Sequence, residues 1–117
     1  MGIDIGRAIL ALMGEGIRVQ RGYPGILMPH LTGAVVAVNV WKDEPYKTTL
    51  VAEICAPMTM GIYACEDMAI RVANCWKGIS GECSFGDKGF DSKSGLYYMK
   101  VKGVWWKEEQ TSTEAET

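Results

Sequence analysis

The chain has 117 residues, a length that suits one domain with a sizeable buried core. Hydrophobic residues make up 48% of it and charged residues 22%, which is typical of a globular protein and excludes a disordered chain. The net charge of −2 provides no electrostatic basis for sequence-specific nucleic-acid binding. No apolar run approaches the roughly 20 residues that a membrane span needs. The first residues, MGIDIG, lack the features of a secretory signal, so we expect the chain to be made in the cytoplasm.

The first third of the chain predicts a helix, a short strand and a long connection. Residues 2–12 place apolar side chains on one helical face, and Gly14 suits a left-handed cap at the end of that helix. Residues 17–20 predict a short strand. Residues 21–33 are rich in Gly and Pro but contain an apolar centre, which consists of Ile26, Leu27 and Met28. This centre either folds back on the core or docks on another subunit.

Two strands follow, over residues 34–41 and 47–55. In the first, Val36, Val38 and Val40 alternate with Val35, Ala37 and Asn39, and the second alternates in the same way. Because only a short turn separates them, we predict an antiparallel hairpin.

Residues 62–76, IYACEDMAIRVANCW, predict the central helix. Apolar residues recur there at spacings of three and four, which puts them on one stripe: Cys65, Met68, Ala69, Val72, Ala73 and Trp76. We expect Thr59 to cap its start, Met58 and Tyr63 to form a hydrophobic staple, and Gly78 to follow its end.

The last part of the chain predicts a short strand at residues 81–85, a polar and mobile loop at residues 86–94, and a final strand at residues 96–106. In the final strand Tyr97, Met99, Val101 and Trp105 share one face. Lys100 and Lys102 share the other, as on a solvent-facing or edge strand. Residues 107–117 predict a disordered acidic C-terminal tail.

This order of elements predicts an α+β fold over residues 1–106, with a mostly antiparallel sheet of about five strands and two helices packed on one face. The other face remains apolar, through Val35, Ala37, Val51, Cys55 and aromatic residues of the last strand. We therefore expect a partner subunit or the long loop to cover part of it.

No catalytic or cofactor-binding arrangement stands out, so we do not expect an enzyme. His30 is the only histidine, and no serine beside it in sequence has the strained turn of a nucleophile. Cys55, Cys65, Cys75 and Cys83 lack the close pairing of zinc ligands, and we interpret them as buried apolar residues. The four tryptophans are interpreted as core or interface residues.

The layout of residues 1–106 resembles the small tail-terminator and minor-capsid proteins of tailed phages, which belong to the neck that joins head and tail. The resemblance rests on four segments: GRAILALM, the pair GAVVAVNVW and TTLVAEICAP, ACEDMAIRVANCW, and GLYYMKVKGVWW. It implies a structural virion protein that forms a homo-oligomer, a hexameric ring, between the tail-tube protein and the head–tail connector protein, with DNA passing through the ring.

The resemblance also implies subunit contacts, for which the candidate residues are Ile26, Leu27, Met28, Tyr97, Trp105 and Trp106. Three alternatives remain open. The chain is another neck or tail component of similar fold, a small ligand- or peptide-binding domain that uses the aromatic face of its last strand, or an enzyme subunit with a reactive cysteine thiol.

Overall fold

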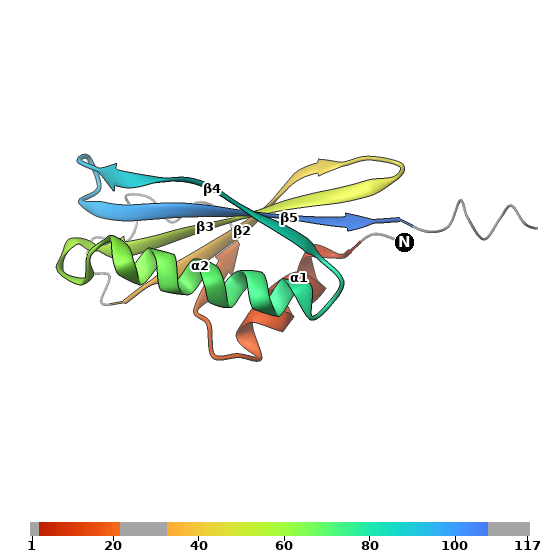
Figure 1. Ribbon diagram of the computed structural model, residues 1–117, viewed down its shortest axis with the longest axis horizontal. Helices are drawn as coiled ribbons and strands as arrows, with labels where there is room; N and C mark the ends of the chain where they lie inside the picture. Colours follow the sequence, from red (N-terminus) through yellow and green to blue (C-terminus); the bar gives the residue numbers. More distant parts are fainter. Residues whose placement is uncertain (1–2, 22–32, 108–117) are drawn as a thin grey trace, which may run out of the picture.

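The computed structural model describes residues 3–21 and 33–107 (Figure 1). Its elements, in chain order, are α1 (Ile5–Met13), β1 (Val19–Arg21), β2 (Val35–Asp43), β3 (Lys47–Pro57), the 3₁₀ helix η2 (Met58–Met60), α2 (Ile62–Lys77), β4 (Glu82–Asp91) and β5 (Leu96–Trp106). None of the helices in these two ranges is both long and apolar enough to cross a membrane.

The five strands form one sheet in the order β1-β2-β3-β5-β4. Four of them are antiparallel, and the short β1 joins the edge of β2 in parallel. Both helices pack on one face of this sheet, as Figure 1 shows. The predicted α+β fold, the hairpin of β2 with β3 and the limits of the last strand are therefore confirmed.

The core lies between the helices and the sheet. The stripe of α2 faces it as predicted: Cys65, Ala69, Val72, Ala73 and Trp76 are buried, and Met68 is partly buried against them. On the sheet, the side chains that face the helices alternate with those of the open face, which we define as the face opposite the helices. Val36 and Val38 of β2 contribute to the core, whereas Val40, on the same side, is exposed.

Two tryptophans lie at the centre of this core. The rings of Trp76 and Trp105 meet edge to face with their centroids 5.2 Å apart. Each indole N–H has a partner, because Trp76 Nε1 donates to the Ala8 carbonyl at 3.3 Å and Trp105 Nε1 donates to the Ile79 carbonyl at 2.9 Å. These bonds connect α2 to α1, and β5 to the turn after α2.

Gly14 and Gly78 directly follow α1 and α2, as predicted, but the left-handed cap at Gly14 and the N-terminal cap at Thr59 that we predicted are wrong. Gly14 and Gly78 are right-handed, with φ of −62° and −64°, and the left-handed positions come two residues later, at Gly16 and Ser80. The start of α2 is capped by Gly61 without a side-chain hydrogen bond, because Thr59 belongs to η2. The predicted staple of Met58 and Tyr63 is also not formed as a buried contact, since both side chains are exposed.

The predicted mobile loop at residues 86–94 is wrong as well. β4 continues to Asp91 through a bulge between Phe85 and Lys88, and only residues 92–95 connect it to β5. The composition of this segment is polar, so it lacks the apolar alternation that predicts a strand. The reason is that β4 is an edge strand, whose side chains are largely exposed while its backbone still pairs with β5. β5 itself is internal, so Lys100 and Lys102 do not lie on an edge.

Two other predictions fall mostly outside the described residues. The connection at residues 22–32, with Ile26, Leu27 and Met28, lies outside them, as do residues 108–117 of the tail. Lys107, which we had assigned to the tail, continues the ordered structure, since its backbone N–H donates to the Tyr46 carbonyl at 2.9 Å.

Candidate functional site

The three described candidates for subunit contacts lie in different places. Trp105 is buried in the core and is therefore not available to a partner. Tyr97 is half-buried on the helix side of β5, where its ring lies 5.0 Å from that of Phe90. Trp106 points to the open face and is half exposed. The alternation of the strand separates Trp105 from Trp106, so the aromatic residues of β5 do not form one binding face.

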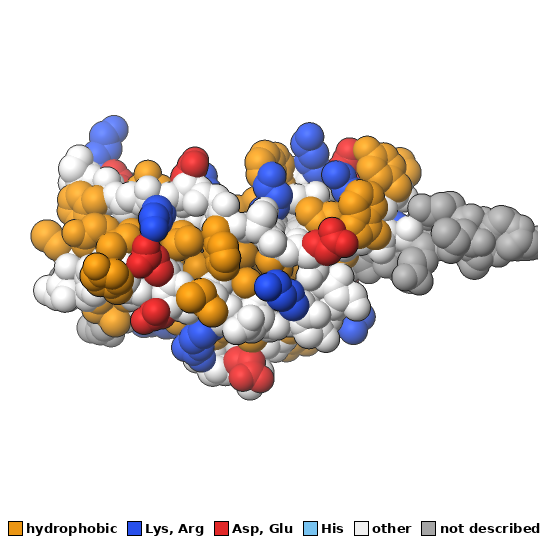
Figure 2. Space-filling model, viewed as in Figure 1, with side chains coloured by type: hydrophobic (Ala, Val, Ile, Leu, Met, Phe, Trp, Pro, Cys, Tyr) orange, Lys and Arg blue, Asp and Glu red, His pale blue; other side chains and the backbone are white. Residues whose placement is uncertain are grey.

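Trp106 belongs to an exposed group of side chains at the end of the β2–β3 hairpin. We call this group the hairpin surface; its members are 47–55% exposed and are Trp41, Tyr46 and Trp106. The hairpin extends beyond the helices at the right end of Figure 1, and Figure 2 shows hydrophobic side chains gathered there. Three aromatic side chains, each about half exposed, present on the order of 200–400 Å². The largest apolar patch on an ordinary monomer has about this size, and such patches are often functional.

Two lysines accompany the aromatic rings of the hairpin surface. Tyr46 and Trp106 stack with their centroids 6.4 Å apart, and Lys47 Nζ lies 5.3 Å from the Trp106 centroid. Lys102 Nζ lies 4.4 Å from the centroid of Trp41. Such cation–π contacts hold the rings in place. The surface is therefore both aromatic and cationic.

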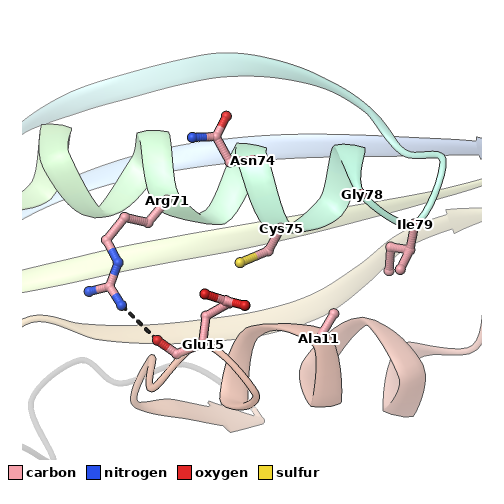
Figure 3. A pocket seen from close by; sticks show the side chains of 7 residues that line it. All are labelled: Ala11, Glu15, Arg71, Asn74, Cys75, Gly78 and Ile79. Carbon is pink, nitrogen blue, oxygen red and sulfur yellow. Dashed lines mark hydrogen bonds between the residues drawn. The ribbon is translucent and has the colours of Figure 1, made fainter.

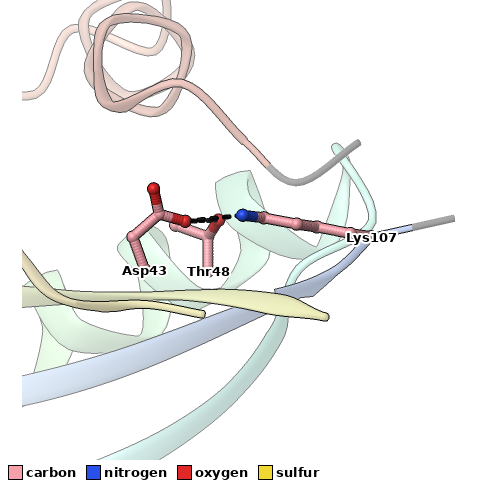
Figure 4. Close-up of polar contacts among 3 residues, drawn as sticks. All are labelled: Asp43, Thr48 and Lys107. Atoms are coloured by element: carbon pink, nitrogen blue, oxygen red, sulfur yellow. Dashed lines mark hydrogen bonds and ion pairs between the residues drawn. The ribbon is translucent and has the colours of Figure 1, made fainter. Parts of the chain in front are cut away.

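A polar cluster anchors the hairpin to the end of β5 (Figure 4). Asp43 Oδ1 accepts from Lys107 Nζ at 2.8 Å and from Thr48 Oγ1 at 3.0 Å. The hydrogen bonds from Lys107 and Thr48 lower the pKa of the Asp43 carboxyl, because they stabilise its charged form. Since this cluster joins β2, β3 and the residue after β5, it orients the hairpin surface.

A second exposed group lies along α2 and the neighbouring edge strand β4. We call it the helix–edge surface; its members are Tyr63, Ile70, Phe85 and Phe90. Lys88 Nζ pairs with Glu66 Oε2 and so links β4 to α2. α2 and β4 run in opposite directions (Figure 1). Ile70 lies one turn after Glu66 on α2, and Phe85 precedes Lys88 on β4, so both residues lie in the same direction from the Lys88–Glu66 pair. Figure 2 shows hydrophobic side chains along this face.

The open face carries a hollow of about 430 Å³ next to the hairpin surface. Its lining mixes Trp41 and Val51 with polar groups from four further positions, Asn39, Asp87, Lys100 and Lys102. Nearby, burial raises the pKa of the Glu53 carboxyl although Lys100 opposes this shift. Farther along the same face Val35, Ala37 and Cys55 are buried and Val51 is half-buried. Our expectation that a partner subunit or the long loop covers this face stays a prediction.

A second hollow, of about 470 Å³, lies between α1 and α2 (Figure 3). Arg71 Nη2 spans it and donates to the Glu15 carbonyl at 2.8 Å. Cys75 lines it as well, and burial raises the pKa of its thiol, with Glu15 adding to the shift and Arg71 opposing it. The arginine is thus used to connect the two helices, and its guanidinium is engaged with protein.

The cysteine thiols are not activated. Burial raises the pKa of Cys55 to about 12 and that of Cys65 to about 11, and it also raises the pKa of Cys83. A thiol that stays protonated at neutral pH is a poor nucleophile. Across residues 3–21 and 33–107, no group of three or more His, Cys, Asp or Glu side chains is placed to hold a metal ion.

The sequence alone did not identify the helix–edge surface or most of the hairpin surface. We had treated the four tryptophans as equivalent, whereas two are buried (Trp76 and Trp105) and two are exposed (Trp41 and Trp106). The sequence did contain a signal that Ile70 is exposed, because this large apolar residue lies outside the apolar stripe of its helix. No protein-family model and no curated protein matches the chain.

Proposed function

We propose that this protein is a structural subunit of a tailed phage: a tail terminator that caps the tail tube as a ring and joins it to the head connector. The layout of residues 1–106 and the α+β fold support this proposal. The observation that carries it is the presence of two separate exposed apolar surfaces, the hairpin surface and the helix–edge surface. A ring of identical subunits needs two different surfaces on each copy, because its contacts run head to tail.

The chemistry of the described residues agrees with a structural role. The thiols of Cys55 and Cys65 are buried and protonated, and Arg71 is engaged with the backbone of α1. In this proposal the protein acts through its surfaces. Besides other copies of this chain, its partners in the virion are the tail-tube and connector proteins. It acts at the neck of the particle.

The test is the mass of the full-length protein in solution, measured by light scattering after gel filtration. We expect one species of about six times the 12.8 kDa chain mass, and a ring in negatively stained images. A strict monomer over the whole range of concentration and salt would contradict the proposal. It would favour the alternative of a small-ligand or peptide-binding domain, for which the hollow beside Trp41 is the candidate pocket.

A further inference from the structure

We infer that α1 and β1 open from the rest of the fold as one unit, at a lower free energy than global unfolding. We call residues 3–21, which contain both elements, the N-terminal segment. When it opens, α2 and the four antiparallel strands stay folded, and the outer side of β2 becomes accessible. Only the single subunit is involved, so the proposed function is not assumed. Three features of the structure carry the inference.

The first feature is the unequal division of the core. The N-terminal segment contributes only three of the buried side chains in the core cluster, Ala8, Leu12 and Ile17, and all the others belong to β2, β3, α2 and β5. The edge-to-face contact of Trp76 with Trp105 lies wholly within these other elements. A region that buries few apolar side chains opens more easily than the region that holds most of the core.

The second feature is the weak attachment of β1 to the sheet. It is three residues long, and it pairs in parallel with β2, from Val36 to Val38. By contrast, β3 and β5 pair antiparallel over eleven residues each. Parallel pairing is slightly less stable per residue than antiparallel pairing. Because β1 lies at the end of the strand order, its departure leaves the sheet β2-β3-β5-β4 intact.

The third feature is the incomplete contact between α1 and α2. The hollow of about 470 Å³ lies between these helices (Figure 3), so the side chains that line it lack packing partners on one side. Two hydrogen bonds bridge the helices. Arg71 Nη2, on an exposed side chain, donates to the Glu15 carbonyl at 2.8 Å, and Trp76 Nε1 donates to the Ala8 carbonyl at 3.3 Å. The second bond is longer than the usual distance.

Opening of the N-terminal segment changes what β2 presents. In the closed state the Val36 N–H donates to the Arg18 carbonyl at 2.9 Å. When β1 leaves, this N–H and its neighbours on the outer side of β2 lose their partners, and an unpaired strand edge is able to accept another strand. The N-terminal segment therefore controls access to this edge of the sheet.

The experiment is native-state amide hydrogen exchange of the full-length protein, resolved by residue with NMR, at increasing urea concentrations below the unfolding transition. We expect the amides of residues 8–13 and of Val36 to exchange with one common free energy. Their exchange should be at least about tenfold faster than that of the most protected amides of α2 and β5. It should also depend less on urea, because opening exposes less surface than global unfolding.

Two variants separate opening from global unfolding. Ile54→Val alters the core beside the start of α2, where the Ile54 carbonyl contacts Cys65 Sγ, and this contact is kept in the open state. It should speed exchange in α2 and β5 by about two- to tenfold and leave residues 8–13 unchanged. Arg71→Ala removes a bond that both opening and unfolding break, so it should speed exchange in both regions by the same factor.

Other results overturn the inference. If Ile54→Val speeds exchange at residues 8–13 as much as in α2, the domain unfolds as a single unit. If residues 8–13 exchange early but Val36 exchanges with α2 and β5, α1 frays alone and β1 stays paired. Equal free energies and equal urea dependence throughout the wild type would exclude opening of the N-terminal segment without any variant.

Discussion

Gly103 shows how a single residue controls the centre of the core. It lies in the interior of β5, and a Cβ placed on it would be 2.6 Å from the ring of Trp76 and 2.8 Å from that of Trp105. Both rings are buried, and they hold each other edge to face. A glycine inside a strand often marks such a close approach. The contact between α2 and the sheet therefore requires that residue 103 has no side chain.

We expect Gly103→Ala to lower the free energy of unfolding by about 1–3 kcal/mol, because the added methyl group forces the two indole rings apart. The measurement is urea denaturation followed by tryptophan fluorescence. Gly33→Ala is the control, since a Cβ at Gly33 meets none of the described residues within 4 Å, and its effect should stay within about 0.5 kcal/mol. Equal effects of the two substitutions would mean that the rings are not packed as described.

The two faces of the helix α2 have different roles: one stabilises the fold and the other is exposed and available for contact. One face carries the buried stripe that holds the helix on the sheet, and the other carries the exposed Ile70. Ile70 and Val72 are two residues apart, and 200° of helical rotation puts them on nearly opposite sides. The same helix thus supplies both core and candidate interface.

Val72→Asp is therefore expected to unfold the domain, because it buries an unpaired charge and the cost of about 4 kcal/mol or more approaches the total stability of a small domain. Ile70→Asp is the matched control on the same helix and should leave the circular dichroism spectrum of the fold unchanged. Both are compared at a protein concentration low enough to avoid assembly. A folded Val72→Asp protein would show that this face of α2 is not part of the core.

For the whole molecule, assembly and stability are linked. If the folded chains associate through the hairpin and helix–edge surfaces, association stabilises the folded state by mass action. The free subunit exposes several large apolar side chains on both surfaces, and the association that we propose would cover them.

We accordingly predict that the melting temperature of the wild type rises with protein concentration, over a hundredfold range, by several degrees. A Trp41→Glu variant should melt at one temperature throughout that range, because a carboxylate placed in the hairpin surface opposes association through that surface. Differential scanning calorimetry measures both. A wild type whose melting temperature does not change with concentration would be evidence against association through the folded subunit.

The sequence by itself determined the parts of the fold that local periodicity encodes. Alternation of Val36 and Val38 with their neighbours, and spacings of three and four in residues 62–76, specified the main strands and the central helix, because burial of one face selects these periods. The limits of β5 followed from the same rule. The α+β class followed from the order of the elements.

Only the tertiary structure decided which edge each strand occupies and which aromatic residues remain exposed. β4 is polar because it lies at an edge, and its pairing with β5 is a long-range interaction that residues 86–91 do not encode in their composition. Trp105 and Trp106 are adjacent in sequence, yet one lies under α2 and the other on the open face. Burial depends on what covers each face of the sheet, and that is a property of the assembled elements.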